Sequence, residues 1–179
     1  MIGFLSKLFG GSKSDKDVKR TQPIVAEINR IYGELQSLSH DVLRNKTQEF
    51  RQQIREHLKD IDAEIAQQKA AAENFDAGDV QSREAVYNEI DKLVKKRDEQ
   101  IEVVLEKIMP QAFAVVKEAA RRFKENAELV STATELDKEL ALEKDHIRIE
   151  GDKAIYRNTW QAAGSTVTWN MVHYDVQLI

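Results

Sequence analysis

The feature that most constrains the fold is a pair of long apolar repeats at helical spacing, separated by one short break. The first repeat runs from Leu43 to Ile65 and the second from Val86 to Ile108, with apolar residues three, four or seven positions apart. Between them, residues 74–79 contain the Asp and Gly residues that favour a turn. Each arm would be about 40 Å long or more if helical throughout. We therefore predict a long antiparallel helical hairpin.

Capping residues predict where the other helices begin and end. Thr21 is suited to cap a helix that has Pro23 in its first turn, where the missing N–H costs nothing. Ser39 is suited to cap the first arm of the hairpin in the same way. Pro110 is expected to end the second arm, and residues 112–126 are expected to form a separate helix.

The C-terminal part of the chain changes from helical to alternating spacing. Ser131-Thr132 followed by Glu135 resembles a capping box that opens a short helix ending at about residue 143. Residues 146–150 and 153–156 alternate around a Gly-Asp pair and predict a β-hairpin, and residues 166–168 are a further strand. The predicted fold class is mainly α, with a small β element near the C-terminus.

Composition excludes several functional classes. The chain has no cysteine, which excludes disulfides and thiolate metal sites and is typical of a reducing cytoplasm. Its net charge of −4 gives no cationic field suited to nucleic acid. The four histidines are scattered without metal-ligand spacing, so no metal site is predicted. No apolar run approaches the roughly 20 residues that span a bilayer.

The charged residues of the helices are interpreted mainly as solvated surface. The acidic residues lie on periodic polar faces, and no catalytic motif or phosphate-binding Gly-Lys loop is present. The basic stretch 121–124 could bind phosphate, but neighbouring Glu118 and Glu125 favour a solvated helix end. The amphipathic residues 1–11 could be a loose tail or a weak membrane-surface anchor.

Four segments of the chain together resemble SecA proteins, in the same order along the sequence. They are Phe4–Gly10 (FLSKLFG), Leu38–Arg51 (LSHDVLRNKTQEFR), Met109–Arg122 (MPQAFAVVKEAARR) and Met171–Leu178 (MVHYDVQL). The last string is specific, and the ordered set is much stronger than any single segment. Two stretches, roughly 56–107 and 147–168, are expanded relative to most of the family, which resembles the SecA form of Bacteroides-like bacteria.

This resemblance implies a division of the chain into five segments. Residues 1–11 would dock on membrane and channel, 12–55 and 108–145 would be helical, and 56–107 would be the helical hairpin insertion. Residues 146–179 would contain the β element and lead into a RecA-like nucleotide-binding domain that this sequence does not include. Because of this resemblance, residues 1–11 are interpreted as a membrane-surface anchor and not as a loose tail.

The resemblance also implies that Gln177 reads the adenine of ATP. A glutamine amide offers one donor and one acceptor, which match the N7 and N6 amino group of adenine. Met171 and Tyr174 would supply weaker apolar or stacking contacts near the base, and His173 and Asp175 would orient the segment. The cofactor would be ATP, bound as Mg-ATP by the full-length protein.

In function, the resemblance implies the N-terminal part of an ATP-dependent translocase that pushes unfolded preproteins through a membrane channel. The expected partners are the SecYEG channel, an anionic phospholipid surface, preproteins and a second copy in a homodimer. The expected location is cytoplasmic, peripheral on the inner membrane. Without a phosphate loop, the 179-residue chain alone is predicted to be inactive. The alternative is a non-enzymatic helical adaptor or scaffold whose hairpin is a coiled-coil-like docking arm.

Overall fold

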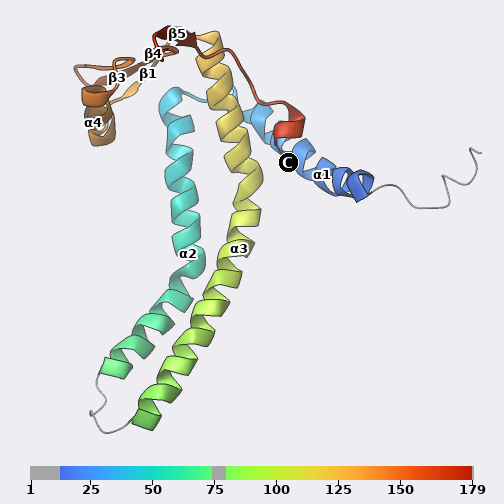
Figure 1. Ribbon diagram of the computed structural model, residues 1–179, viewed down its shortest axis with the longest axis vertical. Helices are drawn as coiled ribbons and strands as arrows, with labels where there is room; N and C mark the ends of the chain where they lie inside the picture. The colour runs from blue at the N-terminus through green and yellow to red at the C-terminus, as the bar shows by residue number, and fades with distance from the viewer. Residues whose placement is uncertain (1–12, 74–79, 179) are drawn as a thin grey trace, which may run out of the picture. The chain divides into compact units, whose positions relative to one another are not determined.

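The computed structural model describes residues 13–73 and 80–178, with side chains from Val18 onward (Figure 1). The expected membrane anchor at residues 1–11 and the expected turn at 74–79 lie outside the described residues. The fold is mainly helical with a small antiparallel β element, which confirms the predicted fold class. The elements are α1 (Lys13–Leu35), α2 (His40–Glu73), α3 (Val80–Glu125), β1 (Glu128–Thr132), α4 (Glu135–Glu143), β2 (Ile147–Glu150), β3 (Lys153–Arg157), β4 (Thr159–Ala162), β5 (Ser165–Thr168) and the 3-10 turn η1 (Asp175–Gln177).

The chain divides into two compact units, each of which has its own buried residues. Residues 45–109 form the hairpin unit, made of the greater part of α2 and α3. Residues up to Arg44 together with those from Pro110 onward form the second unit, which we call the base unit. It contains α1, the start of α2, the end of α3, α4 and all the strands.

The hairpin unit is held together by one narrow apolar stripe on each arm. Its buried cluster consists of Leu58, Ile61, Ile65 and Leu93. An ion pair also joins the arms: Arg97 Nε donates to Asp62 Oδ1 over 2.5 Å. The two arms run antiparallel (Figure 1), as the paired apolar repeats predicted.

Two expected helix boundaries are wrong because proline does not interrupt these helices. Helix α1 begins at Lys13, not at Thr21, and Pro23 lies in its interior. Thr21 Oγ1 donates to the carbonyl of Val18 over 3.1 Å, as a hydroxyl inside a helix does. Pro110 likewise lies within α3, so the expected separate helix is the end of α3. Each proline removes one backbone hydrogen bond, and the good helix formers around it outweigh that loss.

The cap at Ser39 is confirmed, whereas the expected capping box near residue 131 is wrong. Ser39 Oγ accepts a hydrogen bond from the N–H of Val42 over 3.2 Å at the start of α2. The cap of α4 is Thr134, whose N–H donates to Asp137 Oδ2 over 2.7 Å. Ser131 and Thr132 belong to β1 because that strand pairs with β3.

A three-stranded antiparallel sheet of order β1-β3-β2 and a separate β4–β5 hairpin make up the β element. The predicted hairpin is confirmed as β2 and β3, and the predicted third strand is confirmed as β5. The turn between β4 and β5 places Ala163 at φ 49° and Gly164 at φ 78°, a left-handed pair that suits a tight hairpin. Sequence reasoning did not predict β1 and β4.

Four of the described charged residues of the base unit are buried, among them Lys117 at 9% exposure. This corrects the interpretation of the charged helix residues as solvated surface. Glu118 and Asp137 are fully buried, and Arg122 is 4% exposed. Arg122 Nε donates to Glu118 Oε1 over 2.7 Å, and Arg121 donates to both oxygens of the same carboxylate. Burial by itself would raise the pKa of Glu118. The hydrogen bonds from these two guanidinium groups lower it by more than burial raises it, so the pKa lies below the ordinary glutamate value. These arginines therefore hold protein carboxylates and are not a free phosphate site.

Asp137 joins three elements of the base unit. It accepts hydrogen bonds from Arg44 Nη2 over 2.7 Å, from the Thr134 N–H and from the hydroxyl of Tyr156. Burial alone raises the pKa of Asp137, and these bonds lower it well below the ordinary aspartate value. Burial and the bond to Asp137 together raise the pKa of Tyr156 to about 12. The ionised carboxylate thus ties α2 and α4 to β3.

Candidate functional site

The segment that carries Gln177 leaves the β element and ends in η1. Its start is fixed at Trp169, whose backbone N–H donates to the carbonyl of Asn158 over 2.8 Å. The indole Nε1 of Trp169 donates to the carbonyls of Ala120 and Met171, over 3.1 and 2.9 Å. One side chain therefore attaches the segment to the end of α3.

The other end of the segment is fixed by a buried leucine. Leu178 is 3% exposed and belongs to the apolar core of the base unit. Burying a leucine side chain contributes about 1.5–3 kcal/mol. The residues buried with it come from α1, α2 and α3, and are Ile28, Leu35, Leu43 and Ala114.

Asp175 attaches the turn between these ends to α1 and α3. Its Oδ1 accepts from Asn29 Nδ2 over 3.0 Å and from Lys117 Nζ over 3.4 Å. Lys117 Nζ also donates to Asn29 Oδ1 over 2.7 Å, so the three side chains form one network. The hydrogen bond from Asn29, and then that from Lys117, lower the pKa of Asp175 below the ordinary aspartate value. The carboxylate is therefore charged at neutral pH.

The amide of Gln177 is exposed, and its orientation is set by its own turn. Gln177 Oε1 accepts from the backbone N–H of Tyr174 over 2.8 Å, and the backbone N–H of Gln177 donates to the Tyr174 carbonyl over 2.8 Å. A backbone N–H can only donate, so the amide oxygen must face it. That oxygen keeps a second lone pair, and the Nε2 group is a donor. One acceptor and one donor are thus presented in a defined order.

The other expected site residues differ in their positions. Met171 is 43% exposed and Tyr174 is 75% exposed, so both offer apolar surface at the face of the segment. Tyr174 is in direct contact with Gln177 through its backbone. His173 instead lines a pocket behind the segment, and its buried Nδ1 has no hydrogen-bond partner among the described residues. Gln177 therefore lies in one turn with Tyr174 and Asp175, whereas His173 lines the pocket.

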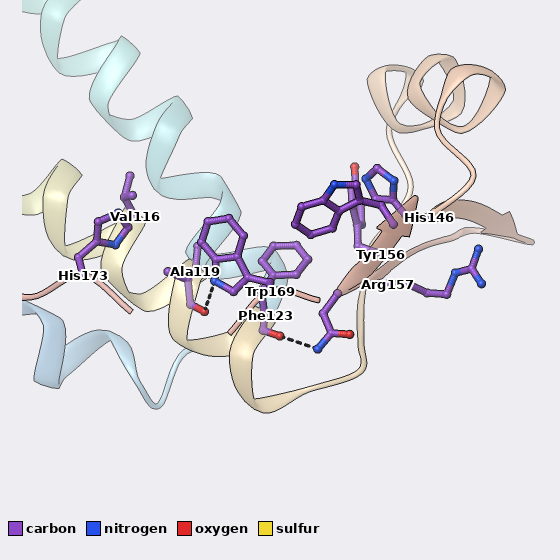
Figure 2. A pocket seen from close by; sticks show the side chains of 11 residues that line it. Val116, Ala119, Phe123, His146, Tyr156, Arg157, Trp169 and His173 are labelled. Atoms are coloured by element: carbon purple, nitrogen blue, oxygen red, sulfur yellow. Dashed lines mark hydrogen bonds between the residues drawn. The ribbon is translucent and has the colours of Figure 1, made fainter. Parts of the chain in front are cut away.

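The pocket behind the segment has a volume of about 480 Å³ and is largely aromatic (Figure 2). Figure 2 shows His173 beside Val116 on α3, while His146 lies close to Tyr156 of the sheet. The rings of His146 and Trp160 are 6.2 Å apart. Gln177, Met171 and Tyr174 do not line this pocket. It is an apolar cavity within the base unit, distinct from the exposed amide.

Sequence reasoning missed two polar side chains that contact the segment. Asn29 lies on α1, where no motif distinguished it from other polar helix residues. Lys117 lies within the quoted Met109–Arg122 segment, but nothing in the spacing indicated that it would be buried. Their contacts arise because α1 and α3 pack together, far apart as they are in the sequence.

The described residues show neither a metal site nor a membrane span. No group of three or more His, Asp or Glu side chains in residues 13–73 and 80–178 is placed to hold a metal ion. No helix in that part of the chain is both long enough and apolar enough to cross a membrane.

Comparison with known proteins extends over nearly the whole chain. Residues 5–179 match the model of the SecA DEAD-like domain. The chain is 46% identical over 176 residues to the protein translocase subunit SecA of Porphyromonas gingivalis ATCC 33277, covering 98% of this chain and 16% of that protein. No solved structure matches the chain.

Two further relatives, both also described as protein translocase subunit SecA, cover the chain equally well. That of Flavobacterium psychrophilum is 46% identical over 178 residues, or 99% of this chain and 16% of its own length. That of Bacteroides fragilis is 47% identical over 175 residues, or 98% and 15%. The chain thus spans about one sixth of these relatives, and the resemblance to the Bacteroides-like form is confirmed. From the ordered motifs and this match, the chain belongs to the SecA DEAD-like family.

Proposed function

We propose that this chain forms the N-terminal part of a SecA-type translocase and supplies its adenine-reading amide, Gln177. The observation that supports this is the fixed order of donor and acceptor on that exposed side chain. Adenine presents an amino donor at N6 and an acceptor at N7 on the same edge. Gln177 Oε1 would accept from N6 while Nε2 donates to N7, and Tyr174 and Met171 would contact the base with their exposed apolar atoms.

The chemistry of hydrolysis would come from other parts of the full-length protein. Phosphoryl transfer depends on a phosphate cradle, Mg²⁺ and positioned charges. This chain contains no Gly-x-x-x-x-Gly-Lys loop, and the guanidinium groups of Arg121 and Arg122 are occupied by Glu118. The 179-residue chain would therefore contribute base recognition to an ATP-driven motor and would not turn over ATP by itself.

The role of Gln177 is tested by removing one adenine contact at a time in the full-length protein. Wild type should bind ATP about tenfold more tightly than 7-deaza-ATP, since the latter lacks the N7 acceptor and a bidentate pair is worth about 1–3 kcal/mol. Gln177→Glu replaces the donor with an acceptor, so this preference should disappear. Gln161→Ala, at an exposed glutamine of β4, is the matched control. Equal preference in wild type and Gln177→Glu would show that the amide does not read adenine.

The proposed setting is the cytoplasmic face of the inner membrane, with the SecYEG channel, anionic phospholipid, unfolded preproteins and a second copy as partners. Its support is the relatives' description as translocase subunits, together with the amphipathic sequence of residues 1–11. So short an apolar face binds lipid weakly and reversibly. Sedimentation with anionic vesicles, with and without residues 1–11, measures the contribution of this segment. Equal binding by the two forms would contradict the anchor.

A further inference from the structure

The exposed amide of Gln177 depends for its position on a network that we call the Asp175 anchor, composed of Asn29, Lys117 and Asp175. Asp175 lies two residues before Gln177 in the same 3-10 turn. That turn is closed by the Gln177 N–H to the Tyr174 carbonyl over 2.8 Å and by the Leu178 N–H to the Asp175 carbonyl over 3.1 Å. A shift of the Asp175 carboxylate therefore moves the Gln177 amide with it.

The Lys117 end of the anchor is buried and polar. Lys117 is 9% exposed, and a buried ammonium group is costly unless it is paired. Its Nζ donates to Asn29 Oδ1 over 2.7 Å and to Asp175 Oδ1 over 3.4 Å, and it lies 5.1 Å from the centre of the Tyr32 ring. These partners hold the ammonium group at one point between α1 and the Gln177 turn.

Asn29 fixes the direction of the network. Its amide oxygen faces Lys117, which can only donate, so its Nδ2 group must face the carboxylate of Asp175. The distance from Nδ2 to Oδ1 is 3.0 Å, shorter than that from Lys117. Asn29 therefore relays the position of Lys117 to the turn, in addition to the direct contact.

We infer that Asn29 and Lys117 are positioning residues that set the base selectivity of Gln177. The inference rests on the proposed reading of adenine by that amide. Adenine and guanine both present N7, but guanine has an acceptor at position 6 where adenine has a donor. An amide held with its oxygen toward position 6 accepts adenine and repels guanine. If the turn moves, the amide oxygen no longer lies opposite position 6 of the base and the distinction is lost.

The experiment measures the affinities of ATP and GTP for the full-length protein by titration with fluorescent nucleotide analogues. Lys117→Met and Asn29→Leu should each lower the ATP-over-GTP affinity ratio at least fivefold, chiefly by weakening ATP. Lys117→Arg keeps a donor and should retain most of the ratio. Lys92→Met removes an exposed lysine from the same helix and should leave the ratio unchanged. Equal weakening of both nucleotides would show a merely structural role and would overturn the inference.

Two more variants separate this inference from the proposed function. Gln177→Ala should bring the ATP-over-GTP affinity ratio close to one. If the ratio stays at the wild-type value, the proposed reading of adenine by Gln177 is refuted. If Gln177→Ala abolishes the ratio while Lys117→Met and Asn29→Leu stay within twofold of wild type, only the positioning role is refuted. Asp175 is 65% exposed at its side chain, so Asp175→Ala should fold even where a buried substitution does not. It should lower the ratio as Lys117→Met does, and an unchanged ratio would refute the anchor.

Discussion

Replacement of Arg122 by methionine should destabilise the base unit more than any surface arginine substitution. The guanidinium group makes contacts with α1, with α3, with the link between α1 and α2, and with the first residue of α2. Its Nη2 donates to the carbonyls of Leu35 and Leu38 over 3.2 and 2.7 Å, and its Nη1 donates to His40 Nδ1 over 3.0 Å. Burial, and then the charge of Arg122, lower the pKa of His40, which keeps that imidazole neutral and able to accept.

The magnitude follows from what methionine leaves behind. Glu118 is fully buried and would lose the hydrogen bond from Arg122 Nε, while the carbonyls of Leu35 and Leu38 would lose a donor. Removing one partner of a buried ion pair costs about 3–5 kcal/mol. Glu118 keeps its contacts with Arg121, so the lower part of that range is expected. With a urea slope of about 2 kcal/mol per M, the unfolding midpoint should fall by about 1.5 M.

Tryptophan fluorescence during urea unfolding measures this change in the base unit. Both tryptophans, Trp160 and Trp169, lie in the base unit, so the signal does not report on the hairpin. The matched control is Arg30→Met, because Arg30 pairs with Glu27 and Glu34 on the surface of α1 and its side chain is 55% exposed. Such surface pairs contribute little to stability because water and salt screen them. A midpoint shift for Arg122→Met no larger than that of Arg30→Met would refute the reasoning.

Two further predictions concern the other buried groups. The depressed pKa of Asp137 stabilises the base unit at neutral pH, and this contribution should be lost as pH falls below about 4, the unfolded value. Asp137→Asn should therefore show a smaller stability loss than wild type between pH 6 and 3; parallel curves would contradict this. In the hairpin unit, Leu58→Ala should lower the free energy of unfolding by about 2–4 kcal/mol, whereas Leu105→Ala, at an exposed position, should lower it by less than about 0.5 kcal/mol. Hydrogen exchange of the backbone amides of the hairpin measures both changes. Similar protection in both variants would exclude the packing assigned to Leu58.

Sequence reasoning succeeded where a local pattern has one dominant cause. The apolar repeats predicted the hairpin because a helix buries residues three or four positions apart whatever its partner. The Gly-Asp pair predicted the β2–β3 turn because Gly151 must adopt φ 60°. Ser39 predicted a helix start because its hydroxyl can accept from the N–H of Val42. Each of these depends on residues close together in the sequence.

The wrong boundaries share one physical cause. Pro23 and Pro110 locally favour a helix start or end, but each costs only about one hydrogen bond and a steric adjustment of ~3 kcal/mol. The good helix formers around each proline, together with the packing of α1 and α3, outweigh that cost. The strand β1 was missed for a related reason, since its partner β3 lies more than 20 residues later in the chain.

The sequence by itself determined the family, the helical hairpin and the identity of the candidate amide, Gln177. Motif order and periodicity are properties of the linear chain, so they need no knowledge of packing. Only the tertiary structure decided that Glu118, Arg122 and Asp137 are buried, because the burial of a side chain depends on which elements, distant in the sequence, pack over it. The same holds for the Asp175 anchor, whose contacting residues are 58 to 146 positions apart in the sequence. They meet because α1, α3 and the segment that carries η1 pack into one core.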